Sequence, residues 1–163
     1  SPMQNLMTAD EAFGIAIQVE ENAAEFYRTA AEQHPEAEQK QFLRKLVDME
    51  RKHKRIFTEM RRELDSDDSG TASLSDEGGL FLAAIADGYR TEGSPTDRRE
   101  LTGSESLQDI TRTGLELEKQ SVLFYEGIRD VMNDQEGRNR IQQIIDEEKQ
   151  HVVRLTAELK KLA

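Results

Sequence analysis

The sequence predicts an all-α fold: a four-helix bundle of two antiparallel hairpins, joined by one long crossover that contains a short helix. Three observations support this prediction. The 163 residues are dominated by types that favour helices and include only three prolines. Apolar residues recur every three or four positions through four long segments. Two of the connections between these segments are short and the third is long, as in helical bundles with one crossover.

The first two helices are expected at about residues 9–33 and 36–65. Thr8 and Glu11 form the capping-box pattern that opens a helix. In the second helix, the apolar stripe alternates steps of three and four residues without a break. Because the turn at 34–35 is short, the two helices should be antiparallel neighbours.

The last two helices are expected at about residues 104–132 and 135–162, again with a short turn, at 133–134, between them. The crossover, residues 66–103, is rich in Ser, Asp, Gly and Thr at both ends. Its middle carries an apolar run from Gly79 to Tyr89, which is compatible with a short helix. A connection of this length can cross the whole bundle.

This arrangement makes residues 1–163 a single domain with two pseudo-repeats, at about 8–65 and 104–162. The short helix of the crossover is apolar, and its side chains Phe81, Leu82 and Ile85 are expected to cover the bundle or a second subunit. No run of apolar residues is long enough to span a membrane, and no basic-then-apolar signal opens the chain. We therefore expect a cytoplasmic protein without a membrane partner.

The two halves carry the same polar residues within their apolar stripes, 98 residues apart. In each half a Glu is followed by a Tyr after seven residues, a second Glu after thirty and a His after thirty-three. These residues are Glu20, Tyr27, Glu50 and His53 in the first half, and Glu118, Tyr125, Glu148 and His151 in the second. Because the stripes should be buried, we expect all eight side chains to point into one shared core near mid-height.

Four buried carboxylates require positive charge, because unpaired ionised groups in a core are costly and repel one another. The cationic side chains nearest in sequence fall off the stripes and should be solvated. They are Arg51, Lys52, Lys119 and Lys149. Two divalent metal ions would neutralise four carboxylates, and two imidazoles would complete an oxygen-rich site. The chain has no cysteine, so thiolate ligands are excluded. Such a site suits iron, with manganese or zinc as alternatives.

A single Glu-x-x-His pair on a helix has a simpler explanation, since both side chains can be satisfied by structural hydrogen bonds. Two copies with matched glutamates favour a dimetal site, and the alternative is a bundle that has lost its metals. Small residues lie one turn from the single glutamates, among them Ala16 and Gly114. They leave room for peroxide or oxygen, or they reflect close helix packing.

The duplicated pattern resembles the ferritin-like superfamily, and most closely the rubrerythrin-like proteins, over about residues 8–162. The resemblance implies a ferritin-like bundle with a diiron-carboxylate centre. It implies terminal ligands at Glu20 and Glu118, bridging ligands at Glu50 and Glu148, and one further ligand for each metal at His53 and His151. It also implies that Tyr27 and Tyr125, beside the ligands, hydrogen-bond to carboxylates of the opposite half.

Two departures from rubrerythrins are visible in the sequence. The four-cysteine rubredoxin module is missing, so electrons would come from a separate donor protein. Ser121 occupies the position of an extra carboxylate of rubrerythrins, and His151 stands where they typically carry a second Glu. The implied ligand set is closer to that of bacterioferritin.

The leading hypothesis is a non-haem diiron oxidoreductase, rubrerythrin-like, that reacts with peroxide or dioxygen. The second is a ferroxidase or iron-handling protein with bacterioferritin-like chemistry, and the third is a metal-stabilised bundle without enzymatic activity. The net charge of −11 argues against a nucleic-acid partner. The resemblance implies a homodimer.

Overall fold

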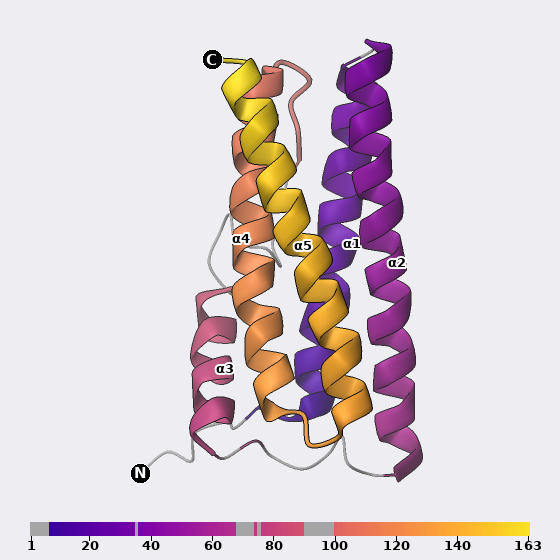
Figure 1. Ribbon diagram of the computed structural model, residues 1–163, viewed down its shortest axis with the longest axis vertical. Helices are drawn as coiled ribbons and strands as arrows, with labels where there is room; N and C mark the ends of the chain where they lie inside the picture. Colours follow the sequence, from indigo (N-terminus) through magenta and orange to yellow (C-terminus); the bar gives the residue numbers. More distant parts are fainter. Residues whose placement is uncertain (1–6, 35, 68–73, 75, 90–99) are drawn as a thin grey trace.

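The computed structural model describes residues 7–34, 36–67, 74, 76–89 and 100–163. Within these ranges it contains five helices and no strand, so the predicted all-α four-helix bundle is confirmed. The helices are α1 (Ala9–Gln33), α2 (Ala37–Asp67), α3 (Glu77–Gly88), α4 (Leu107–Val131) and α5 (Gln135–Lys161) (Figure 1). None of the described helices is both long enough and apolar enough to cross a membrane.

The four long helices form two antiparallel hairpins, α1 with α2 and α4 with α5, and the short helix α3 lies along α4 (Figure 1). The hairpins meet through α1 with α4 and through α2 with α5. Helix α2 ends and helix α4 begins at opposite ends of the bundle (Figure 1). The connection therefore runs the length of the bundle. Much of the predicted crossover, residues 68–73, 75 and 90–99, lies outside the described residues.

Side-chain caps set the helix starts. The predicted capping box is present: Thr8 Oγ1 accepts a hydrogen bond from Glu11 N at 3.1 Å, and Glu11 Oε1 accepts one from Thr8 N at 3.4 Å. Helix α4 begins later than the expected residue 104, because Ser106 caps it by accepting from Asp109 N at 3.0 Å. Glu105 lies before the helix, and its Oε2 accepts a hydrogen bond from Thr102 N at 2.8 Å, which stabilises the preceding loop.

Helix α3 begins two residues earlier than expected, because Asp76 caps it by accepting from Gly79 N at 2.8 Å. Leu82 is fully buried against α4. Gly127 makes room for it, since a Cβ there would lie 2.9 Å from Leu82 Cδ1. Phe81 stays 48% exposed. The expectation that the apolar side chains of this helix cover the bundle therefore holds for Leu82 and for the partly buried Ile85, but not for Phe81.

The apolar core consists of two clusters, one toward each end of the bundle. The first cluster is centred on Phe13, Phe57 and the isoleucines of α5, and the second on Phe26, Leu43 and Leu155. The four buried glutamates lie on their helices between residues of these two clusters. The polar residues are therefore held at mid-height, with apolar packing above and below them.

Candidate metal centre

The structure brings all six predicted ligand residues into one buried group. Each is buried on its helix. Helix α1 supplies Glu20, α2 supplies Glu50 and His53, α4 supplies Glu118, and α5 supplies Glu148 and His151. Five of the six are at most 1% exposed, and His151 is 6% exposed. The 98-residue spacing in the sequence thus corresponds to two matched halves of a single cluster.

The donor atoms fall into two sets that share two glutamates. In each set the ligand atoms lie within 4.8 Å of one another. The first set is Glu20, Glu50, His53 and Glu148, and the second is Glu50, Glu118, Glu148 and His151. Each set offers three carboxylates and one imidazole, and Glu50 and Glu148 belong to both. This is the pattern expected of two ion positions with two bridging carboxylates.

The closest contacts within the cluster join a histidine of one hairpin to a glutamate of the other. His53 Nδ1 lies 2.6 Å from Glu148 Oε1, and His151 Nδ1 lies 3.2 Å from Glu50 Oε1. Each histidine also faces the single glutamate of its own hairpin. These distances are 3.6 Å from His53 Nδ1 to Glu20 Oε1 and 3.5 Å from His151 Nδ1 to Glu118 Oε1. Each Nδ1 atom therefore faces carboxylate oxygens from both hairpins.

The cluster fits cations better than it fits an internal hydrogen-bond network. Every one of the six residues has at least one buried nitrogen or oxygen without a hydrogen-bond partner, although buried polar atoms are normally paired. The short approach of His53 Nδ1 to Glu148 Oε1 is a contact without hydrogen-bond geometry. Among the described residues, no Lys or Arg forms an ion pair with the four glutamates. Oxygen and imidazole donors that converge without hydrogen-bond partners suit a metal ion.

The protonation states of the metal-free cluster follow from its burial. Burial, followed by the charge of Glu148, raises the pKa of Glu20, and the same causes raise the pKa of Glu50 well above its usual value. Burial would also raise the pKa of Glu148, but the adjacent rings of His151 and His53 outweigh it and lower that pKa to about 2. For His53, burial is outweighed by Glu148 and Glu20, which raise its pKa to about 10.

The two tyrosines connect the hairpins through hydrogen bonds to the single glutamates. Tyr27 of α1 donates to Glu118 Oε1 of α4 at 3.0 Å, and Tyr125 of α4 donates to Glu20 Oε1 of α1 at 2.6 Å. Each bond runs to the opposite half, as the resemblance implied. Burial and nearby carboxylates raise the pKa of both phenols well above 10, so both remain protonated donors.

The comparisons with known proteins agree with this geometry. Residues 3–69 match the rubrerythrin family model. The structure also superposes on a solved chain from Thermotoga maritima, described as a candidate ferritin-like diiron-carboxylate protein, with a TM-score of 0.75. The two chains share 23% identity, and the alignment covers 99% of this chain and 100% of the other. No curated protein matches. The fold is therefore ferritin-like, the first hairpin resembles rubrerythrin, and the buried cluster fits a dimetal protein.

Two small residues of α4 are Ser121, a departure from rubrerythrin, and Gly114, one turn from Glu118. Ser121, at the position of the extra carboxylate, is buried, and its hydroxyl donates to Leu117 O at 2.9 Å. Gly114 is small because Tyr27 packs against it: a Cβ at this position would lie 2.9 Å from the Tyr27 hydroxyl oxygen. Of the two explanations for the small residues, close packing therefore applies at Gly114.

One residue of the site was missed by the sequence analysis. Glu147 of α5 lies 3.2 Å, through Oε1, from Nε2 of His53, the ring nitrogen that faces away from the cluster. Its other oxygen accepts a hydrogen bond from Lys52 Nζ at 3.3 Å. The sequence carries no clear signal for it, because Glu147 lies beside the apolar stripe of α5 and its contact with His53 depends on how α5 packs against α2. Carboxylates in this position orient a ligating imidazole and make it more basic.

Proposed function

We propose that the protein is a non-haem diiron oxidoreductase that reduces peroxide or dioxygen. The observation that carries this proposal is the convergence of four buried carboxylates and two imidazoles, with unpartnered donor atoms, into two sets that share Glu50 and Glu148. Two iron ions bound there would supply two electrons, which together with two protons reduce hydrogen peroxide to two molecules of water. The oxygen and nitrogen donors would also accept manganese or zinc, so the donor types alone do not select iron, and its identity as the bound metal is itself proposed.

The surrounding residues are arranged to hold the carboxylates and to exclude water. Tyr27 and Tyr125 fix one oxygen of Glu118 and of Glu20, respectively, which leaves the second oxygen of each carboxylate available inside the cluster. Burial limits the contact of the six donor residues with bulk water, and His151, at 6% exposed, is the least shielded of them. Donors that are fixed before the ions arrive need little reorganisation on binding.

Access to the cluster favours an uncharged or anionic reactant. A surface pocket of about 380 Å³ reaches His151 between α2 and α5. Its charged wall consists mostly of cations, with Asp48 as the one acidic residue: Lys45, Lys52, Arg55 and Arg154. A positive rim raises the free energy of an approaching ferrous ion but does not oppose hydrogen peroxide or dioxygen. This favours the oxidoreductase over the ferroxidase alternative.

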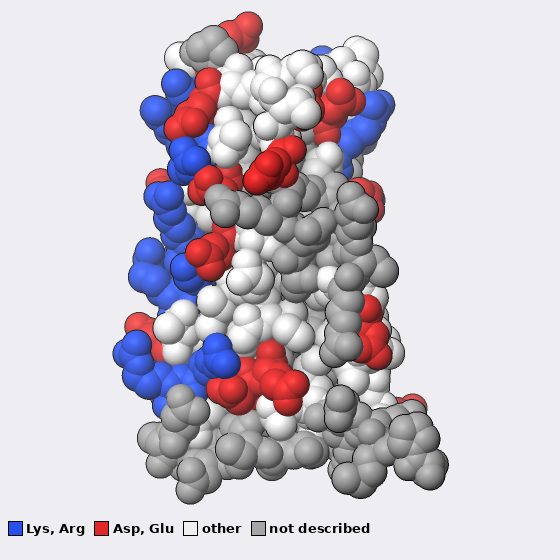
Figure 2. All heavy atoms as spheres, turned by 180° about the vertical axis from the view of Figure 1, so that it is seen from behind, with Lys and Arg blue, Asp and Glu red and all other residues white. Residues whose placement is uncertain are grey.

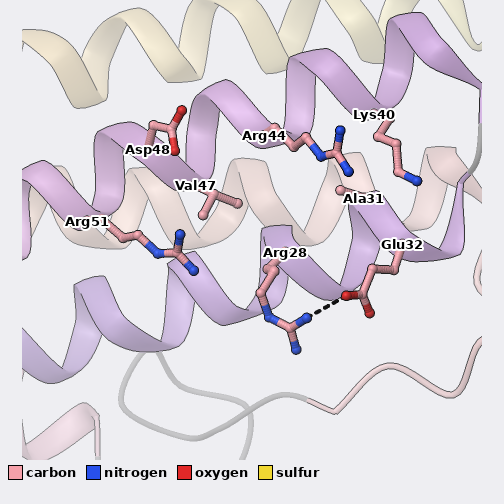
Figure 3. Close-up of a pocket in the computed structure, with 8 residues that line it drawn as sticks. All are labelled: Arg28, Ala31, Glu32, Lys40, Arg44, Val47, Asp48 and Arg51. Carbon is pink, nitrogen blue, oxygen red and sulfur yellow. Dashed lines mark hydrogen bonds and ion pairs between the residues drawn. The ribbon is translucent and has the colours of Figure 1, made fainter.

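The electron donor is proposed to be a separate protein with an acidic surface. Although the chain has a net charge of −11, residues 40–55 of α2 hold seven Lys or Arg and two acidic residues, one of them the buried Glu50. Lys and Arg gather along the edge of the molecule where α2 lies (Figure 2). Beside α2 lies a pocket of about 310 Å³ whose charged lining has four cations and two acids: Arg28, Lys40, Arg44 and Arg51, with Glu32 and Asp48 (Figure 3). Such a band attracts an acidic partner at low ionic strength.

The ferroxidase function is the second candidate, because Ser121 and His151 make the ligand set more like that of bacterioferritin than that of rubrerythrin. In a ferroxidase, ferrous iron would be the substrate and would turn over repeatedly at the same carboxylates. The two candidates differ in the oxidant that they prefer and in the number of turnovers that added iron supports.

The test begins with the purified protein, loaded with ferrous iron without oxygen. Elemental analysis should give two iron ions per chain, and stopped-flow mixing should show faster oxidation by hydrogen peroxide than by dioxygen, without repeated turnover of added ferrous iron. Glu118→Gln should reduce both the iron content and the oxidation rate. Glu116→Gln, two residues away and exposed on the same helix, is the matched control and should change neither. Repeated turnover of ferrous iron with dioxygen would identify the ferroxidase instead, and protein that binds no metal would contradict both candidates.

A further inference from the structure

We propose that the two metal positions are not equivalent: the position completed by His53 binds its ion more tightly than the position completed by His151. This inference rests on the proposed dimetal centre. It concerns residues around the cluster in which the two halves of the chain differ. The repeat makes that difference easy to locate, because every ligand has a counterpart 98 residues away.

On the side away from the cluster, the His53 ring contacts a carboxylate that is itself bound by a lysine. Its Nε2 lies 3.2 Å from Glu147 Oε1, and Glu147 Oε2 is in turn bound by Lys52 Nζ at 3.3 Å. His53 is fully buried, and the side chain of Glu147 is 18% exposed. With Nε2 facing a carboxylate, Nδ1 is the nitrogen directed into the cluster. The contact therefore fixes the orientation of the ring before a metal binds.

The His151 ring has no such support at the corresponding position. The residue 98 positions before Glu147 is Met49, whose thioether carries no charge and accepts hydrogen bonds only weakly. Met49 and His151 instead line the same surface pocket. His151 is the most exposed of the six ligand residues, at 6%. Its Nδ1 faces Glu50 and Glu118, so the ring presents a ligating nitrogen to the cluster while its outer edge is open.

These differences act in the same direction on ion retention. A carboxylate behind a ligating imidazole typically strengthens metal binding by about 10–100-fold, and only His53 has one. The pocket beside His151 also lets water and small ligands compete at that position. We therefore expect two binding steps that differ by about 10–100-fold in affinity, with the weaker step at the set that contains Glu118 and His151.

The test is a titration of the full-length metal-free protein with Co²⁺, followed by visible absorption and by calorimetry. The parent should show two steps. Glu147→Met copies the Met49 environment and should weaken the tight step by about 10–100-fold, which brings the two steps together. Met49→Glu copies the Glu147 environment and should strengthen the weak step. Glu147→Gln keeps a hydrogen-bond acceptor without the charge and should fall between the parent and Glu147→Met. Thermal melting of each metal-free variant checks that it is folded.

Variants that lack one terminal ligand show which Co²⁺ binding step belongs to which metal position. Glu118→Ala should abolish the weak step and leave the tight one, whereas Glu20→Ala should abolish the tight step. Equal affinities in the parent, or loss of the tight step in Glu118→Ala, would overturn the inference while leaving the dimetal centre intact. Binding of fewer than two Co²⁺ ions by the parent would instead contradict the dimetal centre on which it rests.

Discussion

The contact between Gly114 and Tyr27 allows a quantitative test of how the cluster is built. In Gly114→Ala, the added methyl group would lie 2.9 Å from the Tyr27 hydroxyl oxygen and 3.0 Å from its Cε1. Carbon atoms in contact prefer separations of about 3.5–4.0 Å, so the phenol must move by several tenths of an ångström. Tyr27 is fully buried and packs edge-on against Phe26, at 5.5 Å between ring centroids. Its movement therefore strains the core and lengthens the 3.0 Å hydrogen bond to Glu118.

Three effects determine the change in the free energy of unfolding. Replacing a glycine inside a helix by alanine stabilises it by about 1 kcal/mol. An extra methyl group in a packed core costs about 1–3 kcal/mol. Loss of a hydrogen bond to a buried carboxylate costs about 1.5–3 kcal/mol when it breaks completely. We expect a net destabilisation of about 2 kcal/mol or more, which lowers the melting temperature of a chain of this size by about 4–8 °C.

The assay is urea denaturation of the metal-free protein, with Gly14→Ala as the matched control. Gly14 also lies inside a helix, but the nearest atom to an added Cβ is 3.3 Å away, in the Arg61 guanidinium, which is bound to Asp10 and not packed in the core, so that variant should not lose stability. In a Tyr27→Phe background, Gly114→Ala should cost less, because the closest atom is gone. If Gly114→Ala is as stable as Gly14→Ala, the tight packing of Tyr27 against α4 is wrong.

Three further predictions address the core, the bridge and the protonation of the site. Phe57→Ala should cost about 3–5 kcal/mol in urea denaturation, because the ring is fully buried 4.9 Å from that of Tyr125; a loss below about 1 kcal/mol would contradict its role in the core. Glu148→Ala removes a carboxylate shared by both donor sets, so elemental analysis should find at most one metal ion per chain, and two would refute the bridge. The pKa of His53 is about 10 and that of Glu50 is raised in the metal-free protein, so metal uptake near pH 7 must displace protons. Affinity should rise from pH 6 to pH 8, with proton release visible in calorimetry across buffers; a flat profile would argue against these protonation states.

The sequence predicted the position of the cluster because its residues break a strong pattern. An apolar stripe with a period of three to four residues identifies the buried face of each helix, and a Glu or His in that stripe is conspicuous. A single Glu-x-x-His motif is weak evidence for a metal site. The repeat makes it specific, because the pair Glu50 and His53 recurs 98 residues later as Glu148 and His151. The structure brings these residues together at the expected height in the bundle.

The contacts that escaped prediction depend on how helices meet, which a stripe does not encode. Glu147 lies beside the α5 stripe and reads as a solvated residue, yet it faces His53 because α2 and α5 run side by side at this height. Ser104 and Ser106 are both plausible caps, and only the side-chain hydrogen bond from Asp109 N decides between them. Local spacing thus identifies what is buried, but not which neighbouring helix a partly buried polar side chain reaches.

The arrangement also explains how the two hairpins are held in register around a polar centre. Helices α2 and α5 make far less backbone contact with each other than each makes with its hairpin partner. The cluster spans that seam, since His53 of α2 faces Glu148 of α5 and His151 of α5 faces Glu50 of α2. On the other side of the bundle, the two tyrosine hydrogen bonds join α1 and α4. Ions shared by both hairpins would therefore stabilise the interface between them more than either hairpin, because each ion position draws donors from both.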